Sequence, residues 1–407
     1  MGRPRIQHSD EAGERAAAVT TSYGGPVRSK AVGLGEIAAV FVRLGVTAFG
    51  GPAAHIAMMR REVVQQRQWE DERTFLDLVG LTALLPGPNS TELAIELGRR
   101  RGGRRGLIVA GAAFILPAVL IVTAIAWAYE RVRSTSELVD LRTGILPVVV
   151  AIIAHAAWKL GRTAVRSVLT GAVAVLATVA AALDVHELVI LAAGAVSTFA
   201  WAHRRRAHDA AAVVPLLAAA LAAPLQRSAT TPDVGLVTLW WSFLRIGATL
   251  FGSGYVLVAM LESEFVDRLG VLSSAQLLDA VAIGQVTPGP VFTTATFIGY
   301  LLEGLPGAAV ASAAIFLPAF VLVAALGGPL ERWLRRPAAR ALLDGLNAAA
   351  VGLIVAAAWS LIGPGIDGVL GVVLAAGSLI VLALTDINPT WLIAVGLAVG
   401  LAQLVTG

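Results

Sequence analysis

The sequence predicts an all-α polytopic membrane protein with two inverted, homologous halves, broken or re-entrant helices, and one extra transmembrane helix joining the halves. Three observations predict this fold class. The chain of 407 residues is 57% hydrophobic and only 14% charged, whereas soluble proteins average ~25% charged residues. Helix-breaking motifs recur at one spacing in two parts of the chain, and the loop charges of these parts alternate in opposite order.

Apolar stretches follow one another from about residue 35 to the C-terminus, with no polar block large enough for a soluble domain. In order they are 35–59, 74–98, 107–129, 145–160, 167–183, 187–202, 211–225, 236–261, 276–302, 306–330, 343–362, 369–384 and 390–406. Several are shorter than the ~20 residues that a perpendicular spanning helix needs. We therefore expect pairs such as 145–183 and 343–384 to form short helical hairpins.

These stretches divide the chain into four parts. We expect residues 1–32 to be a disordered cytoplasmic tail, because they are polar and lack the apolar segment of an export signal. Residues 33–202 form the first repeat and residues 235–407 the second, inverted repeat. The linker at 203–234 contains the extra transmembrane helix.

The internal repeat is marked by Pro-Gly-Pro at 86–88 and again at 288–290. Each copy begins 37 residues after a Phe-Gly pair, Phe49-Gly50 in one half and Phe251-Gly252 in the other. At the same offset of 202 residues, Arg43, Gly45, Met58, Glu62, Asp77 and Thr91 match Arg245, Gly247, Met260, Glu264, Asp279 and Thr293. The two halves are therefore expected to share one fold.

Loop charges orient the halves. The loop after the second apolar stretch carries five arginines between positions 99 and 105, whereas its counterpart has only Glu303. The next loop is charge-balanced at 130–142 and basic at 331–340, and the following loop carries Lys159, Arg162 and Arg166 where its counterpart has a lone Asp367. Because basic loops stay in the cytoplasm, the halves should be inverted, with the N-terminus cytoplasmic and the C-terminus external. The stretch at 211–225 supplies the extra crossing that this inversion requires.

Loop charge does not decide whether the first two stretches of each half span the membrane or re-enter it. Both arrangements leave every later loop on the same side. The breaks fall near the middle of their stretches, and this position favours broken or re-entrant elements.

Backbone breaks at membrane depth predict a substrate site, because an unpaired N–H or C=O in lipid costs several kcal/mol. Inverted-repeat transporters bind substrate at such breaks, with half-helix N-termini facing anionic groups. The candidate substrate-binding residues are Gly50, Gly51, Pro86, Gly87, Pro88, Asn89, Ser90 and Thr91 in the first half, and Gly252, Ser253, Gln285, Pro288, Gly289, Pro290, Thr293 and Thr294 in the second. The alternative is a pair of proline kinks whose freed backbone groups are bonded by Ser and Thr.

Arg43 and Arg245 are further candidates for substrate binding, since each lies six residues before its Phe-Gly pair in apolar sequence. A guanidinium can hold two oxygens of an oxyanion at once. The alternative is that these arginines reach the headgroups or pair with a carboxylate. Glu92 and His55 are candidates for proton coupling. Their alternatives are pairing of Glu92 with a nearby arginine and a packed, hydrogen-bonded His55.

Several function classes are excluded. The absence of cysteine removes disulfides and thiolate metal sites. The sequence has no phosphate-binding loop, no nucleophile elbow and no His pair at metal-ligand spacing. We therefore expect no enzyme activity, no cofactor and no metal. The net charge of +4 lies in loops, so the expected partner is the lipid bilayer and not nucleic acid. The oligomeric state stays open, with a homodimer as one candidate.

The break motifs resemble a known family. The first half contains Phe49-Gly50-Gly51-Pro52 and later Leu85-Pro86-Gly87-Pro88-Asn89-Ser90-Thr91-Glu92, and the second half contains one unbroken motif from Gly284 to Tyr300. These motifs resemble the paired signatures of the chromate ion transporter family, in its long two-domain type, over about residues 33–407. The resemblance implies antiparallel halves and a multi-pass carrier of the bacterial inner membrane that expels chromate, with sulfate as the similar oxyanion.

The two signatures differ in this chain. Asn89-Ser90 corresponds to Val291-Phe292, and Arg99 stands where the second copy has Tyr300. We therefore expect an asymmetric site.

Energetics favours export. A dianion leaving an inside-negative cell gains about 2.3 kcal/mol per charge per 100 mV, so export needs no coupled cation, although ion exchange stays open. The alternative is a secondary carrier of a different small anion, such as a carboxylate. A cation carrier should line the breaks with Asp, Glu, Met or Cys, and a channel or structural protein would not need an inverted repeat.

Overall fold

The computed structural model describes residues 33–132, 136–183, 185–203, 235–251, 256–326, 336–385 and 387–406. These residues form helices joined by short connections, with no strand among them. Four of the described helices are long and apolar enough to cross a membrane, and four more are apolar but shorter. The predicted all-α polytopic class is confirmed. The N-terminal tail and the linker crossing predicted at 211–225 lie outside the described residues.

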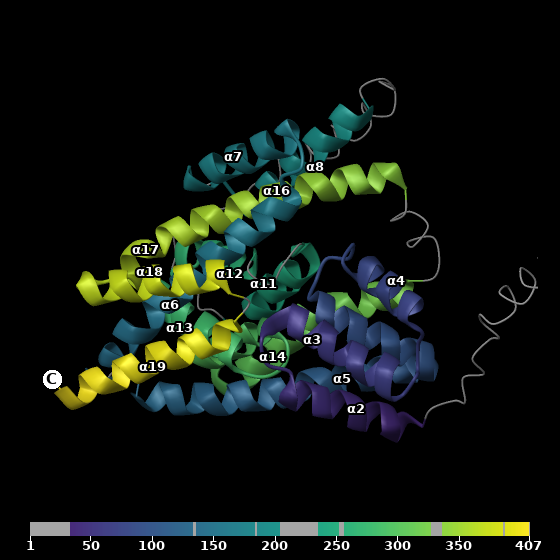
Figure 1. Ribbon diagram of the computed structural model, residues 1–407, viewed down its shortest axis with the longest axis horizontal. Coiled ribbons are helices and arrows are strands. Elements are labelled where there is room, and N and C mark those ends of the chain that lie inside the picture. The colour runs from purple at the N-terminus through teal and green to yellow at the C-terminus, as the bar shows by residue number, and fades with distance from the viewer. Residues whose placement is uncertain are drawn as a thin grey trace, which may run out of the picture.

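The two halves repeat the same order of elements (Figure 1). The first half consists of α2 (Leu34–Thr47), α3 (Gly51–Arg60), the π-helix η1 (Arg61–Gln66), α4 (Glu72–Thr82), α5 (Asn89–Val132), α6 (Ser136–Ala164), α7 (Val168–Ala182) and α8 (Glu187–His203). The second consists of α11 (Leu236–Thr249), α12 (Val256–Leu261), the π-helix η2 (Glu262–Arg268), α13 (Ser274–Val286), the short 3₁₀ turn η3 (Val291–Thr293), α14 (Thr294–Ala325), α16 (Pro337–Ser360), α17 (Ile362–Gly365), α18 (Gly368–Leu384) and α19 (Pro389–Thr406).

The long helices α5 and α14 each fold back on themselves at a glycine. Gly103 and Gly304 have φ of 60° and 61°, which only glycine adopts readily. A Cβ placed on Gly106 would lie 2.2 Å from the carbonyl oxygen of Gly98, although these residues would be ~12 Å apart in a straight helix. Each long helix is therefore a tight pair of antiparallel segments, 89–101 and 104–132 in α5.

The segment from α2 to η1 is a hairpin whose ends lie together. Arg67, just after η1, forms an ion pair with Glu36 in the first turn of α2, at 2.7 Å. Ile37 also lies against Gly102, so this open end is beside the bend of α5. The second hairpin, from α4 to the first segment of α5, has its open end there too, because Arg100 pairs with Glu70 at 3.2 Å. Both hairpins enter and leave at one end of the molecule, as re-entrant elements do.

The break after α2 lies deep relative to this end. Gly45, near the end of α2, approaches the backbone of Phe114 so closely that a Cβ would lie 2.6 Å from its carbonyl oxygen. Phe114 follows the bend at Gly103 by a helical distance of roughly 16 Å at 1.5 Å per residue. That distance is about half of the ~30 Å hydrocarbon core. The break therefore lies near the middle of the thickness that α5 can span.

Helix α4 and its counterpart α13 begin with ordinary side-chain caps. The carboxylate of Asp71 accepts hydrogen bonds from the N–H and hydroxyl of Thr74, and these bonds lower the pKa of Asp71. Ser273, at the equivalent position, accepts from the N–H of Gln276. The two halves thus start their second hairpin in the same way.

The last helices of each half pack on the other half. α7 and α8 pack against α16, while α18 and α19 pack against α6. The expected local hairpins at 145–183 and 343–384 are therefore wrong in their packing, since α7 contacts mainly α16 and α8. Gly365, just after α16, lies against Leu146 and Val150 in the first half of α6, whereas the end of α6 and the start of α16 line one cavity. The equivalent helices α6 and α16 thus run in opposite directions, as inverted halves require.

Candidate functional site

Each Pro-Gly-Pro turn is joined to the opposite half of the molecule by one of two crossed backbone hydrogen bonds. The N–H of Gly87 donates to the carbonyl oxygen of Leu250 at 2.7 Å, and the N–H of Gly289 donates to that of Ala48 at 2.9 Å. Ala48 and Leu250 are the residues that end α2 and α11. Each turn therefore closes on the helix break of the opposite half. We call these four residues the central junction.

Conformation favours glycine in both turns, and at Gly289 space requires it as well. Gly87 and Gly289 have φ of 137° and 92°, in the region that side chains disfavour. A Cβ on Gly289 would lie 2.7 Å from the Cβ of Ala118, and a Cβ on Gly87 would lie 2.6 Å from Oε1 of Glu92. Pro88 follows as the N-cap of α5, because its carbonyl oxygen accepts from the N–H groups of Thr91 and Glu92.

Beside the first turn, the buried His55 of α3 connects the break at the end of α2 to the start of α5. His55 has Nε2 3.0 Å from the carbonyl oxygen of Ala48 and Nδ1 3.1 Å from Oγ of Ser90. Both ring nitrogens are engaged, so His55 has the packed, hydrogen-bonded arrangement that was its alternative. Asn89, by contrast, is partly exposed and lines a cavity.

The second turn is more closed. Pro288, Gly289 and Pro290 are all buried. The hydroxyl of Thr293 donates to the carbonyl oxygen of Pro290, and that of Thr294 to Val291, both at 2.8 Å. These two hydroxyls, predicted to bind substrate, are thus engaged within their own turn.

The remaining predicted residues are placed around the junction or beside it. Gln285 is buried at the end of α13, and its carbonyl oxygen accepts from the hydroxyl of Thr390 at 3.3 Å. Gly50 lies against Asn388 of the second half, a residue that the sequence pattern did not single out. Gly252 and Ser253 lie outside the described residues.

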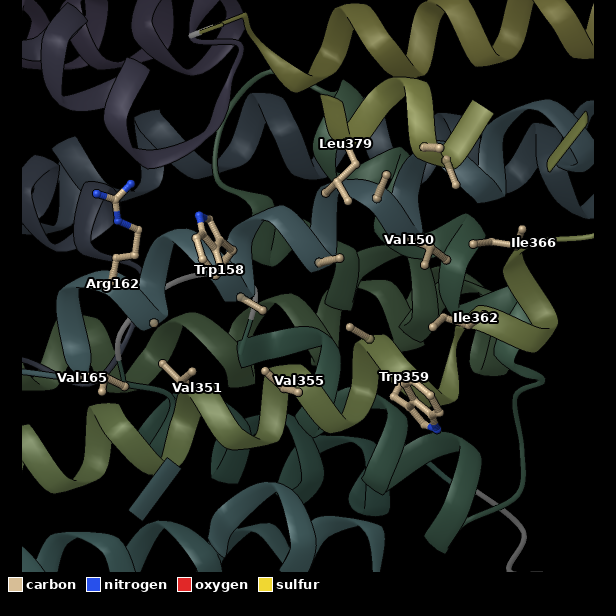
Figure 2. A pocket seen from close by; sticks show the side chains of 17 residues that line it. Val150, Trp158, Arg162, Val165, Val351, Val355, Trp359, Ile362, Ile366 and Leu379 are labelled. Carbon is tan, nitrogen blue, oxygen red and sulfur yellow. The ribbon is translucent and has the colours of Figure 1, made fainter. Parts of the chain in front are cut away.

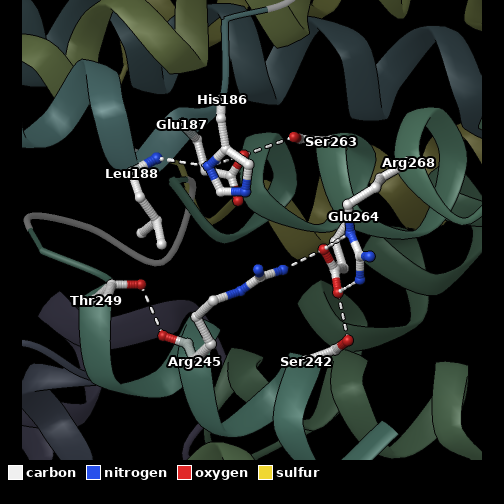
Figure 3. A network of polar contacts seen from close by, with 9 residues as sticks. All are labelled: His186, Glu187, Leu188, Ser242, Arg245, Thr249, Ser263, Glu264 and Arg268. Carbon is white, nitrogen blue, oxygen red and sulfur yellow. Dashed lines mark hydrogen bonds and ion pairs between the residues drawn. The ribbon is translucent and has the colours of Figure 1, made fainter. Parts of the chain in front are cut away.

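The two candidate arginines are held by carboxylates. Arg43 pairs with Glu62, which also accepts from Arg67 at 2.7 Å. In the second half, Arg245 pairs with buried Glu264, and Figure 3 shows Arg268 and Ser242 bound to the same carboxylate. In this conformation, therefore, the guanidinium groups have the ion-pair arrangement that was the alternative to oxyanion binding.

A polar cavity of about 650 Å³ lies beside the first turn. It is open to the outside and is lined by α4, the start of α5, the end of α6 and the start of α16. Its polar lining consists of Asp77, Asn89, Thr163, Arg166, Arg340, Asp344 and Asn347. The sequence pattern treated Arg166 and Arg340 as loop charge and did not single out Asp344 or Asn347. Only the opposite directions of α6 and α16 bring these residues together.

A second cavity, of about 750 Å³, is almost entirely apolar. Figure 2 shows Trp158 and Arg162 toward one end and Trp359 toward the other. It lies between α6, α16 and α18 and includes none of the predicted site residues. An anion would find one guanidinium and little else there, so the polar cavity is the better candidate.

Comparison with known proteins places the chain in a family. A family model described as chromate transporter matches residues 35–199 and again 237–401. The chromate transport protein of Cupriavidus metallidurans is 33% identical over 345 residues, covering 83% of this chain and 85% of that protein. The probable chromate transport protein of Synechococcus elongatus is 33% identical over 340 residues, covering 80% and 84%. The chromate transport protein of Pseudomonas aeruginosa is 30% identical over 328 residues, covering 78% and 79%.

No solved structure matches the chain significantly. The resemblance seen in the break motifs is confirmed by the family match in both halves. The chain is a multi-pass membrane protein that belongs to the chromate transporter family.

Proposed function

We propose that this protein is a secondary transporter that exports chromate, and handles sulfate-like oxyanions, across the inner membrane of a bacterium. The names of the relatives support chromate as the substrate. One observation carries the placement of the site: the crossed bonds of the central junction hold the start of α5 at the edge of a polar cavity.

The start of α5 is suited to an oxyanion. A helix leaves its first N–H groups without intrahelical acceptors, and its N-terminus carries the positive end of the helix dipole. Here those groups belong to Asn89 and Ser90, and the Asn89 side chain adds an amide donor at the cavity wall. An oxyanion at this point would accept hydrogen bonds from neutral donors. Because it would form no ion pair there, its release would not be slowed by one.

The cavity supports entry from the cytoplasm. Arg166 and Arg340 belong to loops that the positive-inside rule assigns to the cytoplasmic side, and both line this cavity. Asp77 and Asp344 oppose them, so the local charge is balanced and binding stays reversible. A chromate dianion that enters here and leaves outside would gain about 4.6 kcal/mol at 100 mV. Membrane potential, ion exchange or both would drive the cycle.

The test is transport into inside-out vesicles, whose lumen corresponds to the cell exterior. With a lumen-positive potential, labelled chromate should accumulate, and unlabelled sulfate should compete. Vesicles without the protein are the control. Accumulation of a small carboxylate such as oxalate, with no effect of chromate, would instead identify the alternative carrier. Chromate uptake that is indifferent to potential and to exchangeable anions would contradict the proposed driving force.

A further inference from the structure

Glu92 is a buried carboxyl group without a compensating partner. It lies one turn into α5 with 0% of its surface exposed, and neither carboxyl oxygen has a hydrogen-bond partner among the described residues. Its side chain folds back toward the first Pro-Gly-Pro turn, where Oε1 lies against Gly87. A carboxyl group therefore points at the turn that forms the proposed oxyanion site.

Among the described residues, no cation is bonded to Glu92. Gly87, against which Glu92 lies, also faces Ala319, a member of an apolar cluster that includes Leu81 of α4, Leu85 of the α4–α5 connection, Ile95 of α5 and Val323 of α14. The titratable groups of α3 and α4 nearest the turn are bonded elsewhere or lie at the cavity, and Arg73 of α4 is exposed. His55 of α3 is bonded to Ser90 and Ala48, and Asp77 of α4 lines the cavity.

Glu96 provides an internal comparison one turn further along α5. It is equally buried at 1% exposure, but Arg99 donates to both of its oxygens, at 2.6 and 2.8 Å. The two carboxyl groups thus lie on the same helix and are equally buried. They differ in compensation, and only Glu92 lacks a cation.

A charged Glu92 is unfavourable in this site for two reasons. An ionised carboxylate without donors in apolar surroundings is so costly that such a group takes up a proton instead. In addition, a dianion at the first turn of α5 would repel a second negative charge about one turn away, in a medium that screens poorly. Glu92 must therefore carry a proton in this conformation, in which it is fully buried, and also while an oxyanion occupies the turn. It can release that proton only when water reaches it.

We propose that Glu92 is the proton-binding site that couples oxyanion transport to proton movement. This inference rests on the proposed function. It selects Glu92 over His55, the other candidate for proton coupling, because both nitrogens of His55 are already engaged.

The experiment uses the purified full-length protein in liposomes that contain a pH-sensitive dye, with the membrane potential clamped by potassium and valinomycin. Sulfate is the probe, because it stays a dianion through the neutral range whereas chromate itself takes up protons there. For the wild type, a sulfate gradient should produce a change of internal pH that a sodium gradient does not affect. Glu92→Gln should keep sulfate counterflow and lose the pH change. Glu96→Gln is the matched control. If this variant still shows sulfate counterflow, it should also still show the pH change.

The outcomes separate this inference from the proposed function. Sulfate counterflow in the wild type without any pH change overturns the proton site alone, and so does an unchanged pH signal in Glu92→Gln. A sodium dependence in place of the pH change also overturns it. Absence of both chromate and sulfate counterflow in the wild type overturns the proposed function itself. Because the wild-type measurement decides by itself, the proposal stays falsifiable even if the variant fails to fold.

Discussion

The first Pro-Gly-Pro turn lies at the edge of a polar cavity, whereas the second is buried on every side. Both turns use the same backbone: a glycine at positive φ that donates across the molecule to the opposite half. Their side chains differ. The first is followed by Asn89 and by an uncompensated Glu92, while in the second Thr293 and Thr294 bind their own backbone.

The difference indicates that the two turns, although duplicated, have one structural role in common and one substrate-binding role that they do not share. The shared backbone geometry joins the halves and holds the centre together. The divergent side chains concentrate polar chemistry and access in the first half. The second turn is therefore mainly a structural counterpart, and the first turn is where we expect substrate to bind.

The largest expected effect is on stability, at the second turn. Gly289→Ala would place a side chain at a disfavoured φ and force its Cβ against Ala118, at a cost of roughly 2–5 kcal/mol. Gly87→Ala meets only the movable end of Glu92 and should cost about 1–2 kcal/mol. Thermal unfolding of the purified variants in detergent measures the difference. A Gly87 variant as unstable as the Gly289 variant would remove the distinction between the turns.

The next effect is on transport, at the polar positions of the turns. Asn89→Ala should lower chromate transport about tenfold or more, because a hydrogen bond to a charged group contributes ~1.5–3 kcal/mol. Thr293→Ala should leave transport within about twofold, since its hydroxyl binds only Pro290 and its loss costs ~1 kcal/mol of stability. Vesicle uptake at matched membrane insertion provides the test. Equal losses in both variants would mean that the halves contribute equally.

The smallest effect concerns the charges of the cavity. Arg166→Ala and Arg340→Ala should each raise the KM for chromate roughly two- to fivefold, because both side chains are exposed and exposed charges contribute ~0.2–1 kcal/mol. Asp344→Asn should lower the KM by a similar factor. The effects should weaken as salt is added. Arg162→Ala, in the apolar cavity, is the control and should change nothing. If Arg162→Ala raised the KM instead, the substrate route would pass through the apolar cavity and the assignment to the polar cavity would be wrong.

Much of the architecture could be predicted from the sequence, because breakers and loop charges are local signals. Equal spacing of Phe-Gly and Pro-Gly-Pro predicted the repeat, and alternating loop charge predicted the opposite directions of α6 and α16. Loop charge could not decide whether the first hairpins re-enter, and only the position of the breaks favoured re-entry. The contacts that close the hairpins, such as Arg67 with Glu36, join residues distant in sequence.

The site could be predicted only in part. The sequence around Asn89 predicted the start of a helix with polar hydrogen-bond donors. The pairing of Arg43 with Glu62 was visible only as an alternative, since a sequence gives no distance between two charges. Arg340, Asp344 and Asn347 were missed, because they line the cavity only after α16 packs beside the end of α6 from the other half.

The most direct test of the central claim is a crystal structure with chromate, using the anomalous signal of chromium to locate the ion. The account predicts a chromium peak at the start of α5, with its oxygens within hydrogen-bonding distance of Asn89 and the first N–H groups of the helix. A peak held by Arg43 or Arg245, at the second turn, or in the cavity between Trp158 and Trp359 would contradict it.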